Sequence, residues 1–190
     1  MIYKTHLAIA PLLTHHTMPL DLLLTPTSTG KILESTYANI EANRVPTTHL
    51  STLHPFHTLW REHLASLRHP GLSDAVIDAF ISLTKGNPKW RSRRDLTTEQ
   101  LINNRREIRA FLKEHAPDVV IVSNCSSEYS FHLRKQSFFH LIFISEHYVN
   151  LWMNTEEEEK RLGLTVLLKA SIDHEIGHWF FTLVSIYLFY

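Results

Sequence analysis

The chain has little cysteine, glycine or proline and no excess of charge of one sign. A single cysteine, Cys125, excludes an internal disulfide framework. Five glycines and eight prolines are too few for a fibrous or low-complexity protein. Lysine plus arginine and aspartate plus glutamate number 19 each, so the zero formal charge gives no general reason to expect a nucleic-acid partner. With 44% hydrophobic residues, the 190-residue chain is predicted to be globular, with one domain or slightly more.

Long hydrophobic runs are also missing. The apolar stretch near the amino terminus is interrupted by Pro11 and is followed by no convincing cleavage site, so it is a poor signal peptide and an intracellular location is favoured. The apolar carboxyl end, residues 179–190, is shorter than the roughly 20 residues that a spanning helix needs. We therefore expect no membrane segment.

Helical patterns dominate the first two thirds of the chain. Residues 1 to about 50 have weak periodicity and several prolines, which predict loops and short helical pieces. Three helices are then predicted from apolar spacing, caps and breakers, over residues 56–67, 74–83 and 98–115. Thr97 and Gln100 have the spacing of a capping box before the third helix.

Strands and one long helix are predicted in the last third. The β-branched run at residues 119–122 indicates a buried strand, and residues 138–144 indicate another, with residues 131–133 as its partner. A helix is predicted to start at Thr155, with Glu158 completing a capping box, and to run to about residue 183. This helix is apolar nearly all round and should therefore be central and buried. The fold class is predicted to be α+β, predominantly helical, with a small mixed sheet next to this helix.

The long helix contains the pattern H-E-x-x-H, formed by His174, Glu175 and His178. At about 100° per residue, histidines four positions apart share one face, so both imidazoles can bind one metal ion. Neutral imidazoles are suitable ligands for Zn²⁺, and the carboxylate of Glu175 can serve as general base for attack of water on a peptide carbonyl. The alternative is that both histidines are hydrogen-bonded core residues and that Glu175 pairs with a basic group.

The region from residue 138 to 184 resembles the zincin superfamily of zinc metalloproteases. The residues around the motif are uncharged and apolar, as the family pattern requires. The resemblance implies a zinc-dependent peptidase with His174 and His178 as metal ligands, Glu175 as catalytic base and a peptide or protein as substrate. It also implies that strand 138–144 borders the cleft with an open edge. We divide the chain into a mostly helical region, residues 1–117, and a zincin-like partial catalytic region, residues 118–190.

The resemblance further implies a third metal ligand, usually located after the motif. Residues 179–190 contain no histidine, aspartate, glutamate or cysteine. We therefore expect a chain truncated after the active-site helix, or else an upstream third ligand, with His140 and His147 as candidates. A catalytically inactive scaffold or binding module that keeps two metal ligands is the alternative function.

A basic segment at residues 89–94, with Arg105, Arg106 and Arg109 farther along, is the one feature that suggests nucleic acid. The simpler interpretation is a solvated loop and helix face. A nucleic-acid partner is therefore not expected.

Overall fold

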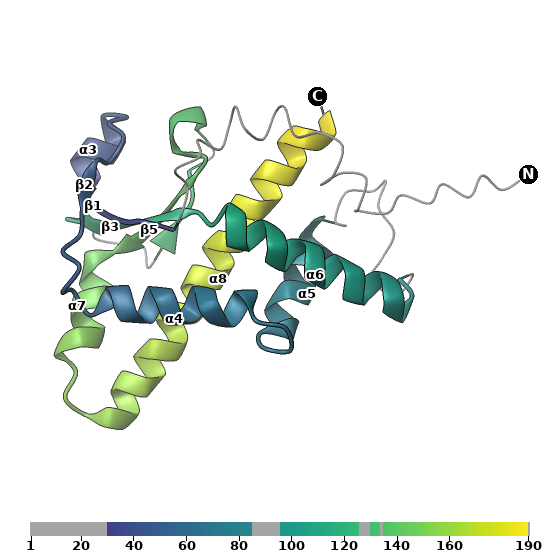
Figure 1. The fold of residues 1–190 in the computed structure, drawn as a ribbon. Coiled ribbons are helices and arrows are strands. Elements are labelled where there is room, and N and C mark those ends of the chain that lie inside the picture. Colours follow the sequence, from purple (N-terminus) through teal and green to yellow (C-terminus); the bar gives the residue numbers. More distant parts are fainter. Residues whose placement is uncertain (1–29, 85–95, 126–129, 134, 190) are drawn as a thin grey trace, which may run out of the picture.

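The structure is a computed structural model that describes residues 30–84, 96–125, 130–133 and 135–189. Within these residues the fold is α+β with a mixed sheet, as the sequence predicts, and it consists of six α-helices and five strands (Figure 1). The division of the chain at residue 117 stays a prediction. In the sheet, the strand at residues 32–36 pairs directly with the strand at residues 118–123, on the other side of this boundary.

The sheet has the strand order β2-β1-β3-β5-β4. Strands β1, β3 and β5 are parallel, and the two-residue strands β2 and β4 are antiparallel to their neighbours. Their bounds are Ile32–Thr36 for β1, Thr48–His49 for β2, Asp118–Ser123 for β3, Ser130–Phe131 for β4 and Leu141–Ser145 for β5. The predicted strands at 119–122 and 138–144 correspond to β3 and β5, although β5 begins later because Gln136–Phe138 form a 3₁₀-helix, η2. The predicted partner at 131–133 corresponds to β4.

Both faces of the central strands are covered. Val119 and Ile121 of β3 pack against the helices α4 to α8, whereas Val120 and Val122 pack on the other face with Ile40 and Phe138. Because side chains alternate along a strand, burial on both faces requires an unbroken apolar run. This is the reason why β3 is recognisable in the sequence.

The three predicted helices of the first two thirds are confirmed as α4 (Phe56–Arg68), α5 (Asp74–Thr84) and α6 (Thr98–Glu114). The capping box of α6 is present in both directions: Gln100 donates its backbone N–H to the side chain of Thr97, at 3.2 Å, and accepts the backbone N–H of Thr97, at 2.9 Å. Local signals of this kind act within one turn and can therefore be read from the sequence.

The prediction of only loops and helical pieces before residue 50 is wrong for residues 32–36 and 48–49, which form β1 and β2, and correct for α3, Tyr37–Glu41. Strand β1 lies between β2 and β3 and pairs Leu33 with Val120. Its partner is distant in sequence and its own composition, ILEST, is mixed, so no local pattern marks it. Residues 1–29 lie outside the described part of the chain.

The last two helices differ from expectation. Residues 146–154 form α7 (Glu146–Asn154), which was not predicted as a helix, and α8 (Glu158–Phe189) begins three residues later than predicted. Thr155 does not cap α8, because it is the C-cap of α7 and its hydroxyl donates to the carbonyl of Leu151 at 2.7 Å.

The prediction that the long helix is buried all round is also wrong. Ile172, Ile176 and Trp179 are fully buried, but Val166 and Leu167 are 60% and 57% exposed. One side of α8 packs against β5 and α5, and the opposite side has no neighbour within the described residues that covers it. Apolar composition alone therefore overestimated how much of this helix is enclosed.

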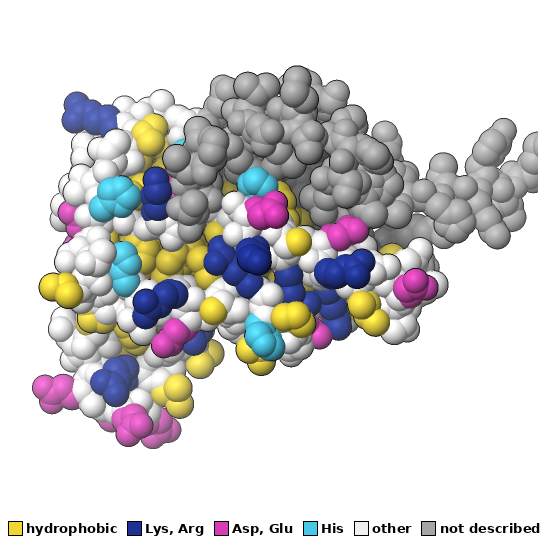
Figure 2. Space-filling model, viewed as in Figure 1, with side chains coloured by type: hydrophobic (Ala, Val, Ile, Leu, Met, Phe, Trp, Pro, Cys, Tyr) yellow, Lys and Arg dark blue, Asp and Glu magenta, His cyan; other side chains and the backbone are white. Residues whose placement is uncertain are grey.

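The face of the molecule shown in Figure 2 carries charges of both signs, with Lys and Arg side chains among Asp and Glu. Residues 89–94 of the basic segment lie outside the described part of the chain. Arg105 donates to Asp74 and Asp78, at 2.8 Å and 2.7–2.8 Å, and Arg109 also pairs with Asp74. These two arginines join α5 to α6, which supports the structural interpretation over nucleic-acid binding. Among the described residues, no helix is both long and apolar enough to span a membrane.

Candidate functional site

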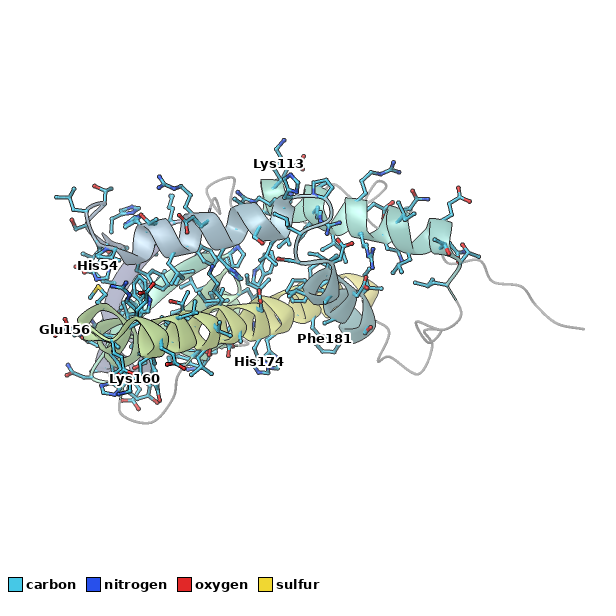
Figure 3. The ribbon with its side chains drawn as sticks, turned by 90° about the horizontal axis from the view of Figure 1, so that it is seen from below. His54, Lys113, Glu156, Lys160, His174 and Phe181 are labelled. Atoms are coloured by element: carbon cyan, nitrogen blue, oxygen red, sulfur yellow. The ribbon has the colours of Figure 1, made fainter. Side chains whose placement is uncertain are left out.

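The two histidines of the motif converge on one point. Their imidazole rings are perpendicular, with centroids 4.5 Å apart, and the two Nε2 atoms are separated by 3.0 Å. Figure 3 shows His174 projecting from the side of α8 that faces away from α4 and α6. His174 is exposed and His178 is half-buried. The helical spacing thus places both nitrogens together, as predicted, while their role as metal ligands stays a prediction.

The geometry of the pair suits zinc. With Zn–N bonds of about 2.0–2.1 Å, two ligands of a tetrahedral ion have nitrogens about 3.3 Å apart. The observed 3.0 Å separation needs only a small rotation of either ring to reach this value. The same contact can also be a hydrogen bond from one neutral imidazole to the other, because one Nε2 then donates and the other accepts.

Glu175 lies on a different side of α8 from His174. Its side chain is buried, with 3% exposure, and its Oε1 accepts a hydrogen bond from the Ser130 hydroxyl at 2.9 Å. Ser130 belongs to β4, so the contact joins the edge of the sheet to the motif helix. A buried carboxylate needs such polar contacts, since desolvation would otherwise be costly.

The orientation of the motif follows from the packing of its apolar neighbours. Trp179 is fully buried and its ring lies 5.7 Å from that of Phe111, whereas Phe180 stacks on Phe80 at 6.2 Å. At about 100° per residue, fixing these side chains toward α5 and α6 leaves His174 pointing outward. The apolar residues beside the motif therefore determine which way its histidines face.

A second polar contact ties the motif to α4. His63 of α4 is 5% exposed, and its Nε2 lies 2.8 Å from Oδ1 of Asp173, the residue before His174. His63 belongs to the buried face of α4, together with Leu59 and Leu67. A histidine on an otherwise apolar stripe is the signal that could have prompted a search for a partner. Ser130, by contrast, had no recognisable signal.

The third metal ligand is not found among the described residues, in which no three His, Cys, Asp or Glu side chains form a group that could hold a metal ion. The candidates His140 and His147 therefore do not join His174 and His178. His147 is exposed on α7, with its ring against Tyr148. Burial lowers the pKa of His140, which follows η2 in a turn.

The prediction of an open edge on strand 138–144 is wrong. Strand β5 lies between β3 and β4, and Ser130 and Phe131 of β4 pair with Ile144 and Phe143. The terminal strand on this side of the sheet is β4, and no other described strand pairs with its outer edge. The edge next to Glu175 is therefore provided by β4.

A cavity of about 580 Å³ lies elsewhere, at the carboxyl ends of β1 and β3. Its walls include Glu34, Arg44, His54, Ser123 and Glu146, and no residue of the motif lines it. Figure 3 shows its wall residue His54 well separated from His174. The cavity and the motif therefore indicate two different places for a functional site. We assign the candidate site from the motif, because its side chains converge.

Comparisons of the chain with models of protein families, with curated proteins and with solved structures give no match.

Proposed function

We propose that the chain carries the zinc-binding and proton-transfer part of a peptidase site. His174 and His178 would hold Zn²⁺, and Glu175 would act as the general base in the hydrolysis of a peptide bond. The observation that carries this proposal is the convergence of the two Nε2 atoms, 3.0 Å apart, one residue from a buried carboxylate that β4 holds in place.

Each residue has a distinct chemical role in this proposal. Zinc, when bound, supplies a Lewis acid that lowers the pKa of water toward about 7. Glu175 takes a proton from water at its carboxylate and passes it to the leaving amine. Ser130 donates to Oε1 of Glu175 and so restricts the orientation of this carboxylate. Its role is to position the base.

The substrate is proposed to be an extended peptide or protein segment. Among the described strands, β4 ends the sheet beside Glu175, and a terminal strand offers backbone groups for strand addition. The resemblance to zincins implied this role for residues 138–144. We transfer it to β4, because β5 is already paired on both sides.

The number of candidate metal ligands favours a second function, a binding module without catalysis. Catalytic zinc sites normally use three protein ligands, and the described residues place only two together. A binding module that keeps the metal pair without catalysis is consistent with this observation. Hydrolysis distinguishes the two functions, because only the peptidase requires Glu175 as a base.

Zinc affinity and hydrolysis of the same variants test the proposal. We expect weak zinc binding that chelators reverse and that disappears in His174→Ala and in His178→Ala. Glu175→Gln should keep the zinc affinity, because it leaves both ligands in place. His147→Ala is the matched control: it removes an exposed histidine outside the pair and should change nothing.

Hydrolysis of an unfolded protein substrate by the zinc-loaded chain should be slow, because two ligands bind zinc weakly. Glu175→Gln should reduce it by about 10²- to 10⁴-fold, the usual contribution of a general base. Equal hydrolysis by wild type and Glu175→Gln would show that Glu175 is not the base. Zinc binding by the pair with no hydrolysis would support the binding module, and zinc affinity independent of both histidines would overturn the metal site.

A further inference from the structure

The cavity at the carboxyl ends of the strands has a chemistry of its own. The register of the sheet places Glu34 of β1 beside Ile121 of β3, and Thr36 beside Ser123, and all four residues line the cavity. Because side chains alternate along a strand, Glu34 and Thr36 lie on the same face as Ile32, which belongs to the core. The floor of the cavity thus combines a carboxylate, two hydroxyls and one apolar side chain.

A second carboxylate and an imidazole belong to the walls. Glu146 is the first residue of α7, directly after β5, and is exposed. His54 precedes α4, and its Nδ1 accepts the backbone N–H of Phe56 at 3.2 Å. Burial, and to a smaller extent His57, lower the pKa of His54, whereas Glu146 and Glu34 oppose this shift. The imidazole is therefore neutral at pH 7, and both carboxylates lie within electrostatic reach of it.

The two carboxylates are able to meet at one group between them. Glu34 pairs with Ile121, and Ile121 pairs with Ile144 of β5, two residues before Glu146. With strands about 4.8 Å apart and a rise of about 3.3 Å per residue, the Cα atoms of the two glutamates are about 12 Å apart. Two side chains of about 5 Å each, with hydrogen bonds of about 2.8 Å, span this distance.

We propose that this cavity binds a primary alkylammonium group, such as the amine of a small aliphatic molecule or the side chain of a lysine. An ammonium group has three N–H donors and no acceptor. The carboxylates of Glu34 and Glu146 accept two of these, and the hydroxyl of Ser123 accepts the third. That hydroxyl donates its own proton to the carbonyl of Ser35, at 3.4 Å, so its lone pairs serve as acceptors.

The rest of the lining suits an aliphatic chain beside the charge. Leu50, Pro46 and Ile121 are buried and line the cavity. Its volume of about 580 Å³ lies within the roughly 300–1,000 Å³ that is usual for sites of small organic ligands. The described residues contain no group of three His, Cys, Asp or Glu side chains that could hold a metal ion. Carboxylates beside an apolar wall therefore favour an organic cation.

Arg44 gives the proposal a test of sign. It lines the cavity, and its guanidinium donates to Oδ1 of Asn39 on α3 at 3.4 Å. With His54 neutral, the charged lining consists of two carboxylates and this one guanidinium, so the cavity is negative. Removal of the Arg44 charge should therefore tighten the binding of an ammonium group. A site for an anion would show the opposite effect.

Nuclear magnetic resonance titrations of the full 190-residue chain with three probes of equal size test the site. The probes are n-butylamine, 1-butanol and butyrate, followed through the His54 ring and the backbone amide of Ser123. We expect saturable binding of the amine alone. N-acetyl-lysine amide carries the same ammonium group, and its affinity relative to n-butylamine distinguishes a lysine side chain from a free amine as the natural ligand.

Charge variants test the assignment of the residues. Glu34→Gln and Glu146→Gln should each weaken n-butylamine binding by about fivefold, the factor for one unit charge about 4 Å from the ammonium in water. Arg44→Gln should tighten it. Glu41→Gln is the matched control, because it removes an exposed carboxylate of α3 that does not line the cavity.

His54 adds a pH dependence. Its protonation places a positive charge beside the amine, so wild-type affinity should fall between about pH 7.5 and about pH 5.5. His57, Glu34, Glu146 and Arg44 are the other charged or titratable groups around this ring or cavity. His54→Asn keeps an acceptor for the Phe56 N–H and cannot take up a proton. The fall in affinity should therefore be smaller in this variant.

Four results would overturn the ammonium site. They are equal binding of n-butylamine and 1-butanol, unchanged affinity in both glutamate variants, weaker binding in Arg44→Gln, and the same pH dependence in His54→Asn as in wild type. The inference does not rest on the proposed peptidase, because His174 and His178 do not line the cavity. His174→Ala should bind n-butylamine as wild type does, and Glu34→Gln should leave zinc affinity unchanged.

Discussion

The environment of Glu175 depends on a hydroxyl that lies 45 positions earlier in the chain. A hydrogen bond to a charged group is worth about 1.5–3 kcal/mol, and loss of one partner in a buried pair is costly. Ser130→Ala should therefore lower the free energy of unfolding by about 1–3 kcal/mol. It should also lower any hydrolysis through poorer positioning of Glu175, while zinc affinity stays unchanged.

Chemical unfolding and zinc titration of Ser130→Ala measure these two effects separately. Ser137→Ala is a suitable control, because the Ser137 hydroxyl makes an exposed hydrogen bond to Asn43 at 3.2 Å. Ser137→Ala should change the free energy of unfolding by no more than about 0.5 kcal/mol, as is usual for surface substitutions. If both variants have the same stability, the buried hydrogen bond between Ser130 and Glu175 stabilises the fold no more than an exposed one does.

At the scale of elements, a buried carboxylate joins β3 to the segment before β1. Asp118 is 6% exposed, and its Oδ1 accepts the backbone N–H of Lys31 at 2.8 Å. Burial raises the pKa of Asp118 above its usual value, and the hydrogen bond from Lys31 opposes this shift only in part. The folded protein thus holds the Asp118 proton more tightly than the unfolded chain does.

This shift has a definite sign for stability. Protonated Asp118 favours the folded state. This contribution to the free energy of unfolding is fully present below the pKa that Asp118 has in the unfolded chain, and it is lost as pH rises through the higher pKa of the folded state. Asp118→Asn keeps an acceptor for Lys31 and cannot ionise. The variant should therefore gain stability relative to wild type between pH 4 and neutral pH, and the difference should shrink in acid.

Urea unfolding over this pH range measures the difference, with exposed Glu62→Gln as the control for charge removal. A stability difference for Asp118→Asn that does not vary with pH would show that the Asp118 carboxyl titrates alike in both states.

At the scale of the whole molecule, α8 is the element on which the core depends. Trp179 is fully buried in the core cluster that also contains Ile121 and Ile144 of the sheet, and its ring lies 5.7 Å from that of Phe111 of α6. Truncation of a buried tryptophan costs about 3–5 kcal/mol through lost contacts and a cavity. We expect a loss of this size in Trp179→Ala, measured by chemical unfolding.

Two comparisons sharpen this expectation. Trp179→Phe should lower the free energy of unfolding less than Trp179→Ala does. It keeps an aromatic ring, and it removes a buried indole N–H for which the described residues provide no hydrogen-bond partner. Leu167→Ala, on the exposed side of the same helix, should change stability by no more than about 0.5 kcal/mol. Equal losses in Trp179→Ala and Leu167→Ala would show that α8 is not anchored through its buried side.

Local patterns predicted much of the fold. Phe56, Leu59 and Trp60 repeat at helical spacing, and all three are buried in α4. The capping pair at Thr97 and Gln100 predicted the start of α6, and the β-branched run predicted β3. The convergence of His174 and His178 followed from helical spacing alone. In each case the responsible interactions lie within about one turn or one strand.

Interactions between distant residues were decided only by the tertiary structure. Sequence spacing could not show that His63 meets Asp173, 110 positions away, or that Ser130 meets Glu175. Nor could it show that β1 enters the centre of the sheet, or that β4 rather than β5 forms its edge. The apolar composition of α8 was visible, but which side is buried depends on where α5, α6 and the sheet lie. Helical periodicity and capping act between near neighbours, whereas strand pairing and burial require the folded chain to bring remote segments together.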